Sequence, residues 1–315
     1  MRIVIKGGRN SMKKLKTERY KPTGVLSAPE LKTAYGKFLY WLFFTVLCIV
    51  VICSVLPAIW TIATAFKGPG EIYTSRSFFP HEFSFPSAKE QILEAWNKLD
   101  LTEATINTVI MSLGQLVFKI VVACFGGYVL SKLKPKGTKF IFALVVWTMM
   151  MPSQIRLVPN YMTYLHFPFA SKGGVSLLDT FWPMWLTAGA DTFAVLLFKN
   201  AFDGLSSAYV EAAKIDGCSN YGIVFKIMMP LVAPVLMYES IMVLSAAWSD
   251  FFTPLLVLDK KRVMPLVIYR LRSDGSIKMN TYFMILVLAS IPPFLIYVIF
   301  QRWIMGGVNI GGVKG

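Results

Sequence analysis

Apolar residues in this chain come in blocks of about 20, and no other feature of the sequence limits the fold as strongly. A helix needs about 20 apolar residues to cross the roughly 30 Å hydrocarbon core of a bilayer. The strands of a closed membrane barrel alternate apolar and polar residues, and these blocks do not alternate. Only 16% of the residues are charged, whereas 55% are apolar. The sequence therefore predicts an all-α membrane protein.

Six membrane spans are predicted, in one domain that covers residues 38–305. A cytoplasmic segment, residues 1–37, precedes the domain, and a short tail, residues 306–315, follows it. Because about 37 mostly polar residues come before the first span, we expect no cleavable signal peptide. The predicted spans cover residues 38–66, 104–131, 140–162, 180–200, 229–252 and 281–305.

The distribution of basic residues predicts the orientation of the spans. Residues 1–36 carry nine Lys or Arg against two acidic residues, whereas residues 67–103 carry four basic and six acidic residues. Because Lys and Arg collect in cytoplasmic loops, we expect both termini and the connections after the second and fourth spans in the cytoplasm. The fifth connection, residues 258–280, opposes this assignment, because it has six basic residues and is expected outside.

Several functional classes are not expected. The net charge of +15 would suggest nucleic acid in a soluble protein, but the orientation of a membrane protein explains it better, so no nucleic-acid partner is expected. Four cysteines and two histidines show no metal-ligand spacing, so we expect no metal site. The phosphate-binding G-x-x-x-x-G-K-[ST] loop and the H-E-x-x-H and G-x-S-x-G motifs do not occur in the sequence. The chain is therefore not expected to be an enzyme.

Residues 206–217, between the fourth and fifth spans, have the pattern of a short capped helix. Serines precede the helix, Glu211 lies in its first turns, near the positive end of the helix dipole, and Gly217 can adopt the left-handed backbone that ends it. About ten residues give a rod of roughly 15 Å, which is too short to span a membrane. We expect it at the cytoplasmic surface. One face would be apolar, formed by Leu205, Tyr209, Ala212 and Ile215.

This segment resembles the EAA loop of binding-protein-dependent permeases. The family pattern is E-A-A, three residues, G, nine residues, I, one residue, L-P. Met229 stands where the family usually has leucine. The matching residues are Glu211, Ala212, Ala213, Gly217, Ile227 and Pro230.

Two more stretches are similar to the maltose-permease-like branch of the sugar importers. Residues 247–255 resemble the W-N-D-F-x-x-P-L stretch of that branch, with Ser249 in place of asparagine. Residues 311–315 resemble its G-A-V-K-G tail, with Gly312 in place of alanine. The resemblance covers residues 39–315 and implies the transmembrane domain of a type I ABC importer.

What the resemblance implies is a permease subunit in the bacterial cell (inner) membrane. Glu211 would contact a cytoplasmic ATPase, Ala212 and Ala213 would allow close approach, and Gly217 would set the exit turn of this coupling helix. The tail is similar to tails that also approach the ATPase. The implied partners are a second permease in a heterodimer, two ATPase subunits that bind ATP and Mg, an extracytoplasmic solute-binding protein, and a mono-, oligo- or polysaccharide.

Polar residues also lie within the predicted spans. Lys119 falls near the middle of the second span, where insertion of a lysine costs about 2.5–3.5 kcal/mol, and Asp191 and Glu239 fall at a similar depth. One basic and two acidic residues at one depth predict either a structural ion pair, or contact with a partner permease, or a polar path for the substrate. Thr108, Ser112, Gln115 and Lys119 lie on one face of the second predicted span. The candidate path consists of Ser112, Gln115, Lys119, Asp191 and Glu239.

An ion-driven secondary transporter is the alternative to an ABC importer. In such a protein Asp191 and Glu239 would form a proton relay within the membrane. Secondary transporters usually contain two repeated halves, and the sequence shows no convincing repeat.

Overall fold

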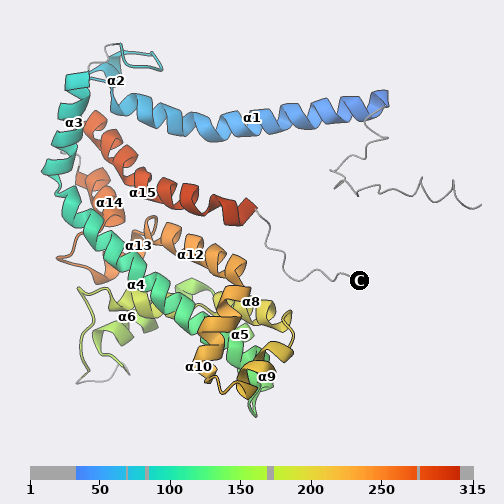
Figure 1. Ribbon diagram of the computed structural model, residues 1–315. Coiled ribbons are helices and arrows are strands. Elements are labelled where there is room, and N and C mark those ends of the chain that lie inside the picture. The colour runs from blue at the N-terminus through green and yellow to red at the C-terminus, as the bar shows by residue number, and fades with distance from the viewer. Residues whose placement is uncertain (1–32, 69, 82–84, 169–173, 275–276, 306–315) are drawn as a thin grey trace, which may run out of the picture. The chain divides into compact units, whose positions relative to one another are not determined.

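The computed structural model describes residues 33–68, 70–81, 85–168, 174–274 and 277–305 (Figure 1). These residues form helices joined by loops, together with one isolated antiparallel bridge between Phe167 and Val175. The predicted all-α class is therefore confirmed. Residues 1–32 of the N-terminal segment and the whole tail lie outside the described residues. By its internal contacts the chain divides into two units, residues 1–60 and 61–315.

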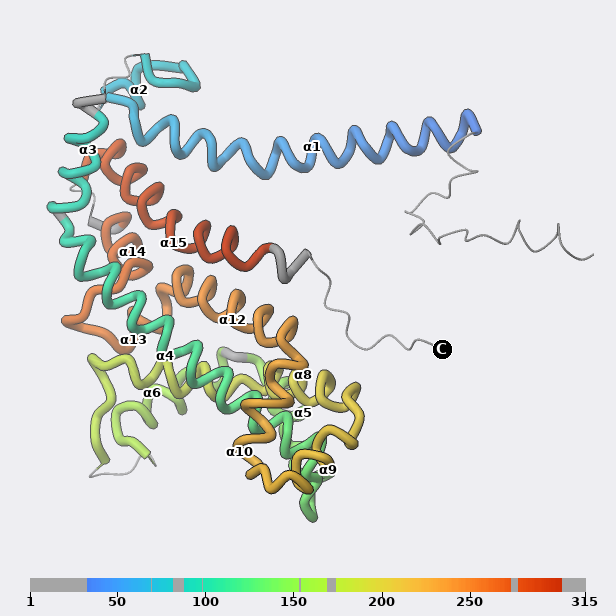
Figure 2. The backbone as a smooth tube through the Cα atoms, viewed as in Figure 1, coloured from blue at the N-terminus to red at the C-terminus, as the bar shows by residue number. Residues whose placement is uncertain are grey.

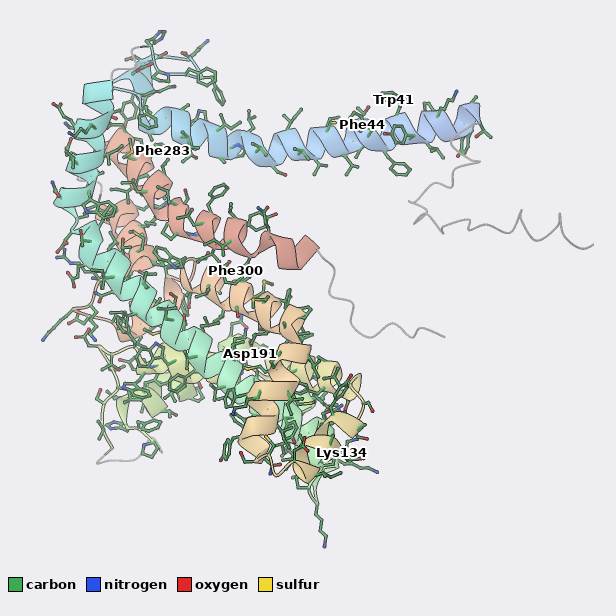
Figure 3. All side chains as sticks on the ribbon, in the orientation of Figure 1. Trp41, Phe44, Lys134, Asp191, Phe283 and Phe300 are labelled. Atoms are coloured by element: carbon green, nitrogen blue, oxygen red, sulfur yellow. The ribbon has the colours of Figure 1, made fainter. Side chains whose placement is uncertain are left out.

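Three helices in the described chain are each long and apolar enough to cross a membrane. They correspond to the first, second and sixth predicted spans. In α1 the apolar side chains point outward along the whole helix, among them Trp41 and Phe44, which are 61% and 47% exposed (Figure 3). Such a surface fits lipid. The three are α1 (Ala34–Ala65), α4 (Leu101–Tyr128), which continues into the π-helix η2 (Val129–Leu133), and α15 (Met279–Met305).

The other three predicted spans are interrupted by bends or breaks. The third and fifth are helix pairs bent by 99° and 87°, and the fourth is broken before Asp191. Pro152 and Pro234, at the two bends, have no N–H to continue the helical hydrogen bonds. The number of membrane crossings stays a prediction. The pieces are α5 (Thr138–Met150), η3 (Ser153–Arg156) and α6 (Leu157–Leu165); α7 (Trp182–Gly189) and α8 (Thr192–Asp203); and α10 (Asn220–Gly222), η4 (Ile223–Met228), α11 (Met229–Leu231) and α12 (Ala233–Ala247).

Helix α4 is the central element of the unit formed by residues 61–315. It packs against α7, α8 and α12, and Figures 1 and 2 show it running diagonally through this part of the chain, near α12 and α8. The contact with α8 is very close, because a Cβ atom on Gly127 would lie 2.8 Å from the backbone nitrogen of Lys199. Such an approach requires glycine, and it makes α4 and α8 a single packed pair.

The two ends of α4 carry different short helices. At its first residues, Leu101 and Ala104 share a buried cluster with α14, whereas Tyr128 at its end shares one with α9. The fifth connection, which contains α14, thus lies at the opposite end of α4 from α9, as the predicted order of spans requires. The short helices are α2 (Glu71–Thr74), α3 (Phe85–Lys98), α9 (Ala208–Ile215), α13 (Phe252–Val257) and α14 (Met264–Asp274).

Candidate functional site

Three charged residues from three helices meet at mid-length of α4. The ammonium nitrogen of Lys119 lies 2.7 Å from Asp191 Oδ2 and 2.9 Å from Glu239 Oε2. Glu239, in α12, is 1% exposed, and within the described residues its Oε2 has no other partner. The three residues predicted to lie at a similar depth are thus joined by two ion pairs, and we call this cluster the Lys119 triad.

Asp191 has a second role at the break between α7 and α8. Its Oδ1 accepts hydrogen bonds from the backbone N–H groups of Phe193 and Ala194, which caps the start of α8. Its other oxygen remains available for Lys119. The interruption of the fourth span therefore positions one carboxylate of the triad beside α4, where Figure 3 labels Asp191.

A cavity of about 1110 Å³ opens beside the triad. Lys119 and Asp191 line it, and so do amide, hydroxyl and aromatic side chains from α4, α6 and α13. Polar groups that fix a ligand by hydrogen bonds and aromatic faces that pack against it are typical of sites for organic molecules. The residues that give the cavity this character are Gln115, Asn160, Tyr161, Tyr164, Phe252 and Thr253.

The structure includes some of the predicted path residues in the cavity wall and not others. Gln115, Lys119 and Asp191 line the cavity, and the amide oxygen Oε1 of Gln115 is buried without a hydrogen-bond partner among the described residues. Ser112 is not part of the cavity wall. Its hydroxyl donates to the carbonyl of Val109 within α4. Glu239 lies behind Lys119 as part of the triad and is not in the wall.

Thr108, on the same face of α4, has a structural role. Its hydroxyl donates to the Ala104 carbonyl and accepts from the backbone N–H of Met264, the first residue of α14. It therefore joins α14 to α4 at some distance from the cavity lining.

The contribution of α6 to the cavity was not predicted from the sequence. Asn160 and Tyr161 lie within the third predicted span, residues 140–162, and Tyr164 follows it. The bend after Pro152 turns these residues toward the cavity. Their polarity next to a proline was a signal that could have identified them.

The predicted coupling helix is present as α9, and its C-terminal end has the predicted conformation. Gly217 has φ +74°, its N–H donates to the Lys214 carbonyl, and the N–H of Cys218 donates to the Ala213 carbonyl. This pair of hydrogen bonds is the Schellman motif that ends helices at glycine. At the other end, Ser207 makes no side-chain cap, and Ser206 Oγ instead accepts from the N–H of Ala208.

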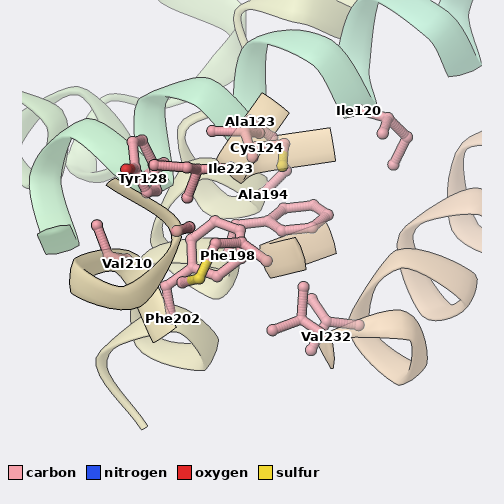
Figure 4. Packing of buried hydrophobic residues seen from close by; sticks show 14 residues of the cluster. Ile120, Ala123, Cys124, Tyr128, Ala194, Phe198, Phe202, Val210, Ile223 and Val232 are labelled. Carbon is pink, nitrogen blue, oxygen red and sulfur yellow. The ribbon is translucent and has the colours of Figure 1, made fainter. Parts of the chain in front are cut away.

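Of the predicted apolar face of α9, Tyr209, Ala212 and Ile215 are exposed and Leu205 is half-buried. The buried residues of the helix are Val210 and Ala213, which pack in a cluster with Tyr128 and Phe202 (Figure 4). Ala213 therefore packs the chain on itself, and its expected part in the close approach of the ATPase stays a prediction. The exposed surface of the helix carries Tyr209, Glu211, Ala212 and Ile215.

The last two residues of the EAA pattern follow α9. Ile227, in η4, is half-buried against the same cluster, and Pro230, in α11, is exposed. The EAA pattern thus covers one folded unit. Buried residues of α9 and of η4 hold α9 in place, and the outer surface of α9 stays exposed.

Polar groups fix the loop that leads into α9. Asp203 accepts from Ser131 at 2.6 Å and pairs with Lys199 at 2.6 Å, and Lys132 donates to the Leu205 carbonyl at 2.6 Å. Burial alone would raise the pKa of Asp203, but the hydrogen bonds from Lys199 and Ser131 outweigh it and lower the pKa. Asp203 therefore stays ionised and holds the end of α8 to the end of α4.

The opposite end of the unit is fixed by Asp179. Its Oδ1 accepts from the backbone N–H groups of Asp259, Lys260 and Lys261. Burial alone would raise its pKa, but these three hydrogen bonds outweigh it and lower the pKa. The carboxylate of Asp179 therefore stabilises the folded state at pH values above the ordinary pKa of an aspartate. This stabilisation is lost as the pH falls through the lowered pKa.

Replacement of Asp179 tests this anchor. The backbone of Asp179 is left-handed, at φ 57°, so Asp179→Gly removes the acceptor only, whereas Asp179→Ala also strains the backbone. We expect hydrogen exchange at the amides of Asp259, Lys260 and Lys261 to accelerate by roughly threefold to tenfold in the glycine variant. Exchange should be faster still in the alanine variant. Equal exchange in all three proteins would contradict the anchor.

The comparisons with known proteins agree with this arrangement. A family model described as the binding-protein-dependent transport system inner membrane component matches residues 119–309, which include the Lys119 triad and α9. The chain belongs to this family. It is thus a membrane-embedded permease subunit of an ABC importer, and the resemblance found in the sequence is confirmed.

Two relatives of this permease illustrate the likeness. The probable ABC transporter permease protein YurM of Bacillus subtilis is 26% identical over 297 residues, which cover 92% of this chain and 93% of YurM. The arabinooligosaccharides transport system permease protein AraQ of Halalkalibacterium halodurans is 31% identical over 214 residues, which cover 66% of this chain and 73% of AraQ.

The fold of the permease is also found in solved structures. A bacterial ABC transporter involved in the import of the acidic polysaccharide alginate has a chain that superimposes with a TM-score of 0.71 at 19% identity. The match covers 86% of this permease and 98% of that chain. The prediction of a type I ABC importer fold is therefore confirmed.

Proposed function

We propose that the permease forms one half of the path by which a carbohydrate crosses the membrane. The cavity beside the Lys119 triad is the observation that carries the proposal, because its amide, hydroxyl and aromatic side chains suit a neutral, hydroxyl-rich molecule. Relatives are named for arabinooligosaccharides, for starch degradation products and for melibiose, raffinose and stachyose. Mono-, oligo- and polysaccharides all belong to the proposed class.

The proposed assembly contains further proteins. A second, different permease would close the path, and an extracytoplasmic solute-binding protein would deliver the carbohydrate. A solved alginate transporter of the same fold is in complex with an alginate pentasaccharide-bound periplasmic protein. Two ATPase subunits would bind ATP and Mg and would contact the exposed surface of α9 through Glu211 and Ala212. The permease itself would hold no cofactor and catalyse no reaction.

The proposed location is the cell (inner) membrane of a bacterium, with both termini in the cytoplasm. The four lysines in the connection after α4 and the exposed surface of α9 lie at one end of the unit, where Figure 3 labels Lys134. A cytoplasmic position of this end satisfies the preference of Lys for that side. It also places α9 where an ATPase is available.

The alternative of an ion-driven transporter loses its main support. Its proton relay required Asp191 and Glu239 to bind and release protons, but both carboxylates are held by Lys119. Asp191 is engaged by two backbone N–H groups as well. An ion pair with these partners is a stable structural element and a poor relay.

A substitution that fills the cavity tests the proposed path. Ala246 is exposed and lines the cavity, so Ala246→Trp is expected to block the path without disturbing the buried clusters. Uptake by the complete importer in vesicles should fall at least about tenfold, which corresponds to roughly 1.4 kcal/mol. Leu113→Trp is the matched control, because Leu113 is 51% exposed on α4 and lies outside the cavity wall. Unchanged uptake in the Ala246→Trp protein would refute the assignment of the cavity.

A further inference from the structure

The chain order of the Lys119 triad relates it to the coupling helix. Asp191 caps the start of α8, and α8 leads into α9. After α9 the chain continues through η4 and α11 into α12, which carries Glu239. The two acidic residues thus belong to the two arms that enter and leave α9, and Lys119 on α4 binds both.

The arm before α9 is firmly joined to α4. Gly127 allows the backbones of α4 and α8 to touch at Lys199, and Asp203 binds both Ser131 and Lys199 at the end of the pair. Helices that are in backbone contact and pinned at one end have little freedom to separate. The Lys119–Asp191 ion pair therefore lies within one rigid body.

The arm after α9 contains a joint. Ile223 and Val224 of η4 are buried in the same cluster as Val210 and Ala213 of α9, and η4 packs directly against α9. Between α11 and α12 the chain bends by 87° at Val232. Abrupt bends next to proline and π-helical turns are places where a helix can change direction. Helix α12 can therefore turn relative to the α4–α8 pair.

Among the contacts by which α12 packs on α4, the Lys119–Glu239 ion pair joins the two helices at mid-length of α4. When α12 turns away, Lys119 retains Asp191 as its partner, while Glu239, which is 1% exposed here, loses its ammonium group. A buried carboxylate without a partner is strongly unfavourable. The pair therefore favours the conformation described here and resists the movement until α9 is displaced.

We infer that Glu239 is a positioning residue whose ion pair with Lys119 acts as a latch between α12 and the α4–α8 pair. The latch holds α8 and α12, which lie before and after α9 in the chain, in their present relative positions until movement of the ATPase displaces α9. This role rests on the proposed function as an importer permease, and it concerns the link between ATP hydrolysis and transport rather than recognition of the carbohydrate.

The test compares substitutions of two neighbouring residues of α12 in the complete importer. Glu239→Gln removes the charge across the joint and leaves the Lys119–Asp191 pair. Ser240→Ala is the matched control, because it removes a buried hydroxyl that donates to the Leu236 carbonyl within α12 and leaves the latch intact. We expect Glu239→Gln to raise ATP hydrolysis in the absence of the binding protein by about fivefold or more, and to lower the carbohydrate taken up per ATP by a similar factor. Ser240→Ala should change this ratio by less than about twofold.

Other results would overturn the latch. Wild-type coupling in a Glu239→Gln protein that assembles normally would show that the pair has no role in coupling. Equal uncoupling by Glu239→Gln and Ser240→Ala would assign the effect to the packing of α12 rather than to the ion pair. If Glu239→Gln does not assemble, Glu239→Asp keeps the charge with a shorter reach and should still uncouple partly; normal coupling there would show that Glu239 serves only folding. A protein that couples normally yet transports no carbohydrate would instead contradict the proposed path.

Discussion

A permease with both Glu211→Ala and Gly217→Val is expected to lose ATP-dependent uptake by at least about 30-fold, the effect of removing a contact worth roughly 2 kcal/mol at a protein interface. Glu211 is exposed on α9 and would supply a charged contact. Gly217 ends the helix at φ +74°, a conformation that valine adopts only with strain, so the exit of the helix would shift. The measurement is uptake in vesicles together with co-purification of the ATPase subunits.

Two single substitutions separate local effects from coupling. Lys214→Ala changes another exposed charge on α9, and Gly204→Ala changes a glycine of the preceding loop whose φ is −69° and therefore ordinary for any residue. Both proteins are expected to retain more than about half of the uptake, since surface substitutions usually change stability by less than about 0.5 kcal/mol. Wild-type uptake and ATPase attachment in the double variant would refute α9 as the coupling helix.

The coupling helix was predictable because its signals are local. A glycine that can adopt a left-handed backbone, four residues after the second of two alanines, predicts a helix end wherever it occurs, and the structure has that end. Which face of α9 is buried was not predictable, because it depends on Tyr128 and Phe202 from distant parts of the chain. Tyr209 and Ile215 accordingly lie outward, although their spacing suggested an apolar face.

The ion triad was predictable for a different reason. Charges are so unfavourable in hydrocarbon that an isolated lysine in a span requires acidic partners at the same depth, and counting along each span was enough to find Asp191 and Glu239. The cavity was not predictable from such counting. It depends on breaks near Pro152 and Ala190, and these breaks turn side chains of α6 and α7 in directions that continuous helices would not allow.

The basic fifth connection is the part of the chain that opposes the predicted orientation. Lys260 and Lys261 offer their backbone N–H groups to Asp179, and the ammonium of Lys261 lies 4.5 Å from the ring centre of Phe181. Their positions are therefore set by hydrogen bonds and a cation–π contact at the end of α4 opposite α9. The preference of lysine for the cytoplasm acts during insertion, when earlier spans already determine orientation.

The substitution Gly114→Ala is expected to destabilise the permease strongly, although it adds only one methyl group. That methyl carbon would lie 2.1 Å from Nε1 and 2.2 Å from Cε2 of Trp185. The indole cannot move aside easily, because its Nε1 donates to the Met111 carbonyl and its ring stacks on Phe118. Overpacking of this kind typically costs about 1–3 kcal/mol, and the loss should appear as a lower temperature at which the purified complex dissociates.

The rest of the experiment determines whether the effect comes from this one contact. Gly70→Ala is the matched control, because nothing lies within 4 Å of the added carbon and φ is −86°. Trp185→Leu removes the ring, so the double variant with Gly114→Ala should be less destabilised than the sum of the two single variants. Additive losses would contradict the clash.

Because α7 ends one residue before the turn at Ala190 that leads to Asp191, the packing of Trp185 on α4 also sets the position of that carboxylate. The surviving Gly114→Ala complexes should therefore transport less carbohydrate per ATP than the wild type.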